Sequence, residues 1–336
     1  MNDCCRPATF EIETPLLNPL SRDSELTSPP QRGESVLITG SSGLVGTELT
    51  KILESQGYRV VKAVRRPPRS SDELEWQPLI PFEQIPVDQR AAFEGFDAVI
   101  HLAGENIAGG RWNKNRKERI RNSRIESTQN LCQLLNSLES PPRIFLSASA
   151  IGGYSQTTDK AQTEEDPFVD GFLGEVCSGW EQSSEILEEK GIRRVLLRIG
   201  LVLSPHGGLL QKLVPLFKCF LGGRISHGQQ WMSWVDLDDL IQIILFSLQN
   251  QKVKGPINCT APGAVRNSEF TLLLASHLGR PVAPPVPALA IQALYGEMGT
   301  NLVLRGSRVI PESLTRMGFK FEHRDLPSSL RNQLTV

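Results

Sequence analysis

Three closely spaced glycines are the first residues in this sequence whose spacing suggests a specific chemistry. Gly40 allows a sharp turn, Gly43 leaves room for a ligand because it has no Cβ, and Gly46 lets a following helix pack closely. The N–H groups at the start of such a helix point outward and favour negative charge. The loop therefore predicts a binding site for the diphosphate of a dinucleotide, formed by Gly40, Ser41, Ser42, Gly43, Leu44, Val45 and Gly46.

A pair of arginines, Arg65 and Arg66, follows the next apolar segment at 58–64. In a dinucleotide-binding fold this position faces the ribose on the adenine side of the cofactor. A carboxylate there accepts a hydrogen bond from the 2′-hydroxyl of NAD, whereas arginine accommodates the 2′-phosphate of NADP. Two cations and no carboxylate favour NADP(H) over NAD(H), with a pair of solvated surface arginines as the simpler alternative.

These residues require particular elements to position them. Residues 36–39 have the apolar pattern of a buried strand, helical spacing of apolar residues begins at Val45, and 58–64 has the pattern of a second strand. An ordinary glycine-rich loop would lack this context. This alternation predicts an α/β fold, a doubly wound parallel-sheet Rossmann domain. Its further strands are expected at 97–104, 143–147, 195–199 and 255–259, with helices at 174–189 and 236–249.

Two later segments would bring small and polar groups to the carboxyl ends of strands. The strand at 97–104 ends in small residues that allow close approach of the cofactor, so the expected contacts are Leu102, Ala103, Gly104 and Glu105. The strand at 143–147 leads into a segment that contains Ser149 and Tyr154. A hydroxyl at this edge of the sheet is suited to hydrogen-bonding a substrate carbonyl or hydroxyl.

Residues 111–124 carry seven basic side chains around Trp112. One interpretation is a nucleic-acid-binding patch. We favour the solvated start of a helix that continues through 138, because apolar residues recur with helical spacing from Thr128 onward. One or two of these cations could still reach an anionic substrate.

Composition narrows the class of partner. The net charge of the 336 residues is −1, and the sequence lacks an apolar run of about 18 residues, so we expect neither a nucleic-acid nor a membrane partner. The six cysteines form no CxxC pair, which favours reduced thiols and a cytoplasmic location, and the histidines show no metal-ligand spacing. We expect a small-molecule substrate bound by a monomer or homodimer.

The chain divides into three expected parts. Residues 1–33 are rich in Pro, Ser and acidic residues and resemble a poorly ordered arm. Residues 34–205 would form the Rossmann domain. Residues 206–332 would form a smaller α+β lobe that covers the substrate, with helices at 209–221 and 288–304 and a short strand at 231–235.

Several motifs in the same order resemble the extended and atypical short-chain dehydrogenase/reductase superfamily, and most closely its epimerase family proteins. Residues 39–46 match the TGxxGxxG motif of the superfamily, and 102–107 match the LAGE-N/P-I signature of the subfamily. Residues 285–321 resemble the subfamily's C-terminal extension, and the resemblance as a whole covers 35–332. Further matches lie at 123–125, 198–203 and 230–234.

The resemblance implies catalytic roles for Ser149 and, less directly, for Tyr154. Ser149 falls where the superfamily places its catalytic Ser/Thr. The Tyr-x-x-x-Lys pair, whose lysine lowers the tyrosine pKa and binds the nicotinamide ribose, should follow near 172–177, but this segment has neither residue. Tyr154 is the nearby phenol, and Glu105 is another candidate proton donor or acceptor.

Two functions follow from these expectations. The first is an NADP(H)-dependent oxidoreductase or epimerase that acts on a small polar, sugar-like substrate. The second is an NADP(H)-binding regulatory or scaffold protein with little turnover, favoured by the missing Tyr-x-x-x-Lys pair.

Overall fold

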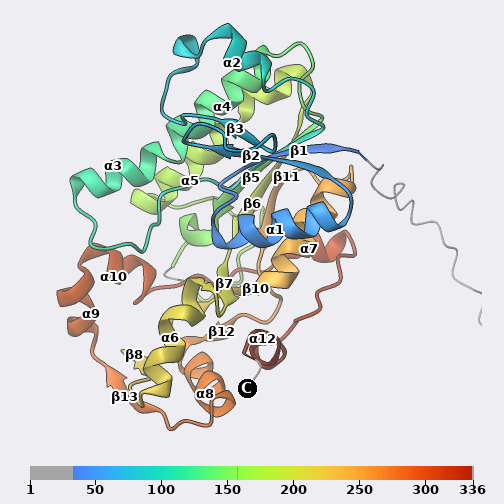
Figure 1. Cartoon of the computed structure of the whole chain (residues 1–336). Coiled ribbons are helices and arrows are strands. Elements are labelled where there is room, and N and C mark those ends of the chain that lie inside the picture. The colour runs from blue at the N-terminus through green and yellow to red at the C-terminus, as the bar shows by residue number, and fades with distance from the viewer. Residues whose placement is uncertain (1–32, 157, 335–336) are drawn as a thin grey trace, which may run out of the picture.

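The computed structural model of the protein describes residues 33–156 and 158–334, so residues 1–32 of the expected arm lie outside the described part. A sheet of seven parallel strands crosses the upper part of the molecule (Figure 1). Its order is β11-β6-β5-β4-β1-β2-β3. The strands are β1 (Ser35–Thr39), β2 (Arg59–Val64), β3 (Glu73–Glu75), β4 (Ala98–His101), β5 (Ile144–Ala150), β6 (Arg193–Ile199) and β11 (Gly255–Cys259).

This strand order creates a ligand-binding edge. The chain moves from β1 to β2 on one side and returns to β4 on the other side of β1. The loops that follow β1 and β4 therefore diverge at the carboxyl edge, where open α/β sheets bind ligands. The expected doubly wound Rossmann fold is confirmed.

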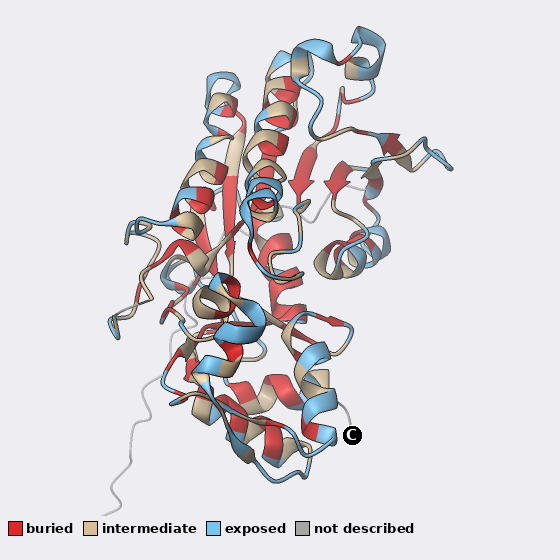
Figure 2. Ribbon diagram, turned by 90° about the vertical axis from the view of Figure 1, so that its left-hand side faces the viewer, coloured by how far each residue is buried: buried red, intermediate tan, exposed pale blue. Residues whose placement is uncertain are grey.

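Helices cover both faces of the sheet because its strands are apolar on both sides. Val36 and Ile38 of β1 pack in a cluster with α1 (Leu44–Ser55) and α7 (Leu237–Gln249). Leu37, between them, points to the opposite face and packs with α4 (Ile125–Ser137). Buried residues accordingly follow the sheet and the inner sides of the helices (Figure 2). Each fully buried aliphatic side chain contributes about 1.5–3 kcal/mol.

A second group of elements lies below the carboxyl edge of the sheet (Figure 1). It contains three pairs of short strands: β7 (Leu201–Ser204) with β10 (Trp234–Asp236), β8 (Gly223–Ile225) with β13 (Ala283–Val286), and β9 (Trp231–Met232) with β12 (Val265–Arg266). Its helices are α6 (Gly208–Lys218), α8 (Asn267–His277), α9 (Ala288–Tyr295), α10 (Glu297–Leu302) and α12 (Leu326–Gln333), whereas α11 (Glu312–Arg316) packs against β11 of the large sheet. No helix in the described ranges is both long and apolar enough to cross a bilayer.

The structure corrects four expected elements. The helix expected to run from the basic segment to 138 is two helices, α3 (Lys114–Asn122) and α4, separated at Ser123 and Arg124. The helix expected at 174–189 is α5 (Phe172–Gln182) followed by the 3₁₀ helix η3 (Glu185–Lys190).

The other two corrections concern the lower part of the molecule. The helix expected at 288–304 is broken at Gly296, whose φ of 58° is left-handed and does not continue an α-helix. The strand expected at 231–235 is split between β9 and β10, which belong to different sheets. In both cases the apolar residues continue on either side of a change in backbone direction, so the sequence pattern predicts one element where the structure has two.

Candidate functional site

The glycine loop between β1 and α1 has the shape of a phosphate cradle. Gly40 has a φ of 72°, and a Cβ on it would lie 2.7 Å from backbone atoms of Leu102 and Ala103. A Cβ on Gly46 would lie 2.2 Å from the backbone oxygen of Gly40. α1 begins after Gly43 without a capping side chain and without an acidic residue in its first turn. The positive end of this helix is therefore available to an anion.

The two arginines after β2 differ in their surroundings. Arg66 donates from both terminal nitrogens to the Glu73 carboxylate, at 2.7 and 2.6 Å. This pairing holds the pKa of Glu73 at about 2, well below its usual range. Arg65 is exposed, and none of the described residues forms an ion pair with it. Arg65 is therefore the one of the two that is available to a phosphate.

The segment after β4 lies against the glycine loop, as the contacts of Gly40 show. The Glu105 carboxylate pairs with Arg116 at 2.8 Å, and the Glu105 backbone N–H donates to Ser123 Oγ at 3.0 Å. The α3 cations also reach α10, where Lys117 pairs with Glu297 at 2.6 Å. Basic side chains of α3 therefore form ion pairs with other parts of the protein.

Ser149 and Tyr154 are joined through a buried ion pair. Ser149 Oγ donates to the Glu181 carboxylate at 2.7 Å, and Arg198 donates to both oxygens of that carboxylate at 2.9 Å. Arg198 also donates to the Tyr154 hydroxyl at 2.6 Å, which in turn donates to Asn258 Oδ1 at 2.9 Å. Sequence reasoning missed Glu181 and Asn258, because their polarity has meaning only once β5, β6, β11 and α5 are packed together.

The Tyr154 phenol is fully buried, and burial raises its pKa to about 12. It is therefore protonated near neutral pH and can donate a proton or a hydrogen bond, but it is a poor base. Its catalytic role stays a prediction.

The α5 residues at 172–177 offer no replacement for a tyrosine–lysine pair. Phe172 and Leu173 pack with Trp112 and Met298 in an apolar cluster that joins α5 to α10. Cys177 is buried, its Sγ lies 3.6 Å from the Ala150 oxygen, and burial raises its pKa to about 12. A thiol in this state is not a nucleophile near neutral pH.

A polar cavity of about 540 Å³ lies between the loop after β5 and the lower part of the molecule. Arg305 lines it, and the Arg266 guanidinium stacks 3.8 Å above the Trp231 ring. Asp159 accepts from Arg266 at 2.8 Å and from the indole N–H of Trp231 at 3.1 Å, and the Arg266 bond lowers the Asp159 pKa. Cations and an aromatic ring in one cavity suit a ring-bearing anion.

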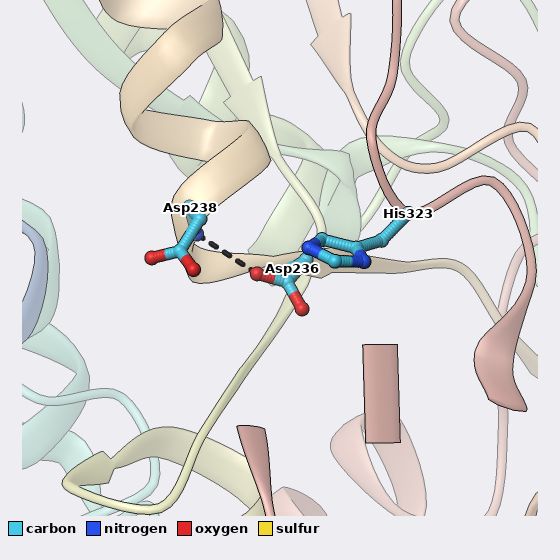
Figure 3. Close-up of side chains that lie close together, drawn as sticks. All are labelled: Asp236, Asp238 and His323. Atoms are coloured by element: carbon cyan, nitrogen blue, oxygen red, sulfur yellow. Dashed lines mark hydrogen bonds between the residues drawn. The ribbon is translucent and has the colours of Figure 1, made fainter. Parts of the chain in front are cut away.

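Asp236, Asp238 and His323 lie close together at the start of α7 (Figure 3). Their arrangement could offer ligand atoms to a cation, but both carboxylates already accept hydrogen bonds. Asp236 caps α7 by accepting from the Asp238 N–H at 2.9 Å and also accepts from Ser329 Oγ at 2.6 Å. Asp238 accepts from Asn332 at 2.8 Å. We therefore interpret the two carboxylates as hydrogen-bond acceptors that connect the start of α7 to α12.

The fold and the glycine cradle define a nucleotide-binding α/β protein, and sequence comparison identifies its family. Residues 36–259 match the NAD dependent epimerase/dehydratase family, and 286–333 match a domain of unknown function, DUF1731. The chain belongs to the NAD dependent epimerase/dehydratase family. The expected family membership, including the subfamily's C-terminal extension, is confirmed.

Relatives with similar length are found in bacteria and plants. Epimerase family protein Mb2239 of Mycobacterium bovis is 38% identical over 295 residues, which cover 88% of this chain and 96% of that protein. Epimerase family protein SDR39U1 homolog, chloroplastic, of Arabidopsis thaliana is 35% identical over 306 residues, with 88% and 86% coverage.

Two solved structures are also similar. Human epimerase family protein SDR39U1 (isoform 2), crystallised with NADPH, is 28% identical with a TM-score of 0.81, covering 90% of this chain and 99% of that chain. The nucleoside-diphosphate sugar epimerase from Corynebacterium glutamicum is 32% identical with a TM-score of 0.74, covering 90% and 58%. An NAD(P)-binding Rossmann fold is thus established for this chain.

Proposed function

We propose that the protein is an NADP(H)-dependent oxidoreductase or epimerase that acts on a small polar substrate, with nucleotide sugars as the first class to test. The observation that carries the proposal is the cradle of Gly40, Gly43 and Gly46 beside Arg65, an exposed arginine without an ion-pair partner among the described residues. The cradle suits the diphosphate and Arg65 suits the 2′-phosphate. The NADPH bound to human SDR39U1 supports this choice of cofactor.

Bound NADP(H) would supply hydride transfer at nicotinamide C4. The residues of the chain would bind and orient the cofactor and the substrate. Ser149 donates its hydrogen bond to Glu181, which also accepts from Arg198, so the Ser149 oxygen is left to accept from a substrate hydroxyl. Tyr154 would hold Arg198 in place, and Glu105, with a partly exposed side chain, is the candidate for exchanging a proton with solvent.

The cavity beside Trp231 is the proposed site for the substrate's anionic part. Arg266 and Arg305 provide charge there, and the Trp231 ring provides a surface for stacking. A nucleotide sugar has both a diphosphate and an aromatic base, and the name of the Corynebacterium glutamicum neighbour agrees with this substrate class.

A second candidate function is NADP(H) binding with little turnover, in a regulatory or scaffold role. It is favoured by residues 172–177 of α5, which include neither a tyrosine nor a lysine: Phe172 and Leu173 pack in an apolar cluster, and Cys177 is a buried thiol. For either function we propose a monomer or homodimer in the cytoplasm.

A turnover screen separates the two functions. The protein is incubated with NADPH and carbonyl compounds, or with NADP+ and nucleotide sugars, while the absorbance of the reduced nicotinamide is followed, and sugar products are analysed for epimerisation. We expect turnover that Ser149→Ala abolishes and that the exposed control Ser55→Ala retains. Tight NADPH binding without turnover of any probe would support the regulatory function.

A further inference from the structure

The break between α3 and α4 turns two adjacent side chains toward the segment that follows β4. Ser123 Oγ donates to the Ile120 carbonyl at 3.1 Å and accepts from the Glu105 N–H at 3.0 Å. Arg124, the next residue, extends beneath Gly104, because its guanidinium atoms lie 3.6–3.8 Å from the position of a Gly104 Cβ.

The Arg124 guanidinium is enclosed by protein on several sides. It lies 5.0 Å from the Trp180 ring of α5, and Nη1 donates to the Ile120 carbonyl at 3.2 Å. Nη1 also reaches Ser123 Oγ at 3.4 Å. These contacts fix the plane of the guanidinium and leave its second terminal nitrogen beside Gly104.

Arg124 lacks a counterion within the part of the chain that the structure describes. Glu105, which follows Gly104 in the chain, is paired with Arg116 at 2.8 Å. α5, which covers the guanidinium, carries two carboxylates, but Glu175 is exposed and Glu181 is paired with Arg198. Burial disfavours the charged form and lowers the pKa of Arg124. Because a charge that is largely enclosed by protein and unpaired is costly, the presence of Arg124 at this point suggests a bound anion as its partner.

The sheet order shows which part of a dinucleotide would lie there. β1 lies between β2, which leads to Arg65, and β4, which leads to Gly104. The glycine loop after β1 is therefore flanked by Arg65 on one side and by Arg124 on the other. With the 2′-phosphate at Arg65, the nicotinamide half of the cofactor extends from the diphosphate toward β4 and β5.

We propose that Arg124 binds the nicotinamide half of NADP(H) by donating hydrogen bonds to the phosphate oxygens on that side of the diphosphate. The inference rests on the proposed NADP(H) site and adds a second cationic contact to it. Arg65 would recognise the adenine half, and Arg124 the nicotinamide half.

The test compares whole and truncated ligands. Dissociation constants of NADPH and of 2′,5′-ADP, which lacks the nicotinamide half, are measured by calorimetry for the wild type, Arg124→Met, Arg124→Lys and the exposed control Arg121→Met. We expect Arg124→Met to weaken NADPH binding roughly 10- to 100-fold and to leave 2′,5′-ADP within about two-fold of wild type. Arg124→Lys should recover part of the loss, and Arg121→Met should match the wild type.

The other outcomes are also decisive. Equal weakening of both ligands by Arg124→Met, unchanged NADPH binding, or no recovery in Arg124→Lys would overturn the inference. Circular dichroism and thermal unfolding of each variant without ligand show whether it is folded. If Arg124→Met is not folded, the binding of NADPH and of 2′,5′-ADP is compared between Arg124→Lys and the wild type. Failure of the wild type to bind NADPH would instead overturn the proposed function.

Discussion

At Gly46 the fold leaves no room for a methyl group, because a Cβ would lie 2.2 Å from the Gly40 oxygen. We predict that Gly46→Ala lowers the free energy of unfolding by about 1–3 kcal/mol, since backbone atoms must move. Urea denaturation measures the change. Gly43→Ala is the control, because its Cβ would lie 3.3 Å from the same oxygen. Gly43→Ala should cost less stability than Gly46→Ala yet still weaken NADPH binding. Equal stability of Gly46→Ala and the wild type would contradict the close packing at Gly46.

The two arginines after β2 should contribute unequally to cofactor binding. Arg66 is held by Glu73 at 2.6 Å, whereas Arg65 is exposed. We predict that Arg65→Ala weakens NADPH binding roughly 10- to 100-fold and NADH binding little, because only NADPH carries the 2′-phosphate. Arg66→Ala should have the smaller effect on NADPH. Fluorescence titration with both cofactors checks this, and a larger loss in Arg66→Ala would reverse the assignment.

The sequence pointed to both arginines, but only the structure separates them. Glu73 follows Arg66 in the chain by a turn that brings β3 beside β2. The sequence also pointed to Ser149, but only the structure shows that its hydrogen-bond partner is Glu181 of α5. Side-chain partners of this kind depend on how elements pack, which the local sequence pattern does not specify.

At the scale of elements, His101 joins β4 to its neighbours. It contacts Thr39 of β1 at 2.7 Å and Thr128 of α4 at 3.0 Å. Burial lowers its pKa from 6.5 to about 4. The unfolded chain therefore binds this proton at higher pH than the folded protein does, and the protein loses stability as pH falls from 6.5 toward 4.

We predict that the free energy of unfolding falls by about 2 kcal/mol between pH 6.5 and 5 through His101 alone, at about 1.4 kcal/mol per pH unit. His101→Gln, which can still hydrogen-bond to both threonines, should be less stable at neutral pH and show a correspondingly smaller loss. Urea denaturation at the two pH values measures both. The same loss in both proteins would show that another group is responsible.

Elements with a continuous apolar pattern were predictable, and their interruptions were not. The sheet strands are short apolar runs, so β1, β2 and β5 follow from the sequence. The break at Ser123 and Arg124 does not, because both residues tolerate a helix and keep a right-handed helical backbone, and their contacts with Glu105 and Gly104 come from a distant segment. The unpredicted break is also where the proposed second cofactor contact lies.

At the scale of the whole molecule, the two parts of the chain meet around the proposed site. Met298 of α10 packs with Trp112 and Phe172, and Arg111 donates to the carbonyl of Leu294 at 3.0 Å. The C-terminal segment that matches DUF1731 is therefore packed against the edge of the Rossmann domain. Sequence motifs predicted both parts, but the cavity between them is formed by residues as distant as Gln156, Trp231 and Arg305.

The proposed cofactor, a dinucleotide with a 2′-phosphate, would lie across the carboxyl ends of β2, β1 and β4. Calorimetric titration of the unmodified protein with NADPH and with NADH tests this proposal most directly. We predict that NADPH binds with a stoichiometry of one per chain and at least roughly 10-fold more tightly than NADH. Equal affinity for the two cofactors would contradict the proposed role of Arg65 in recognising the 2′-phosphate, and binding of neither would contradict the proposed NADP(H) site.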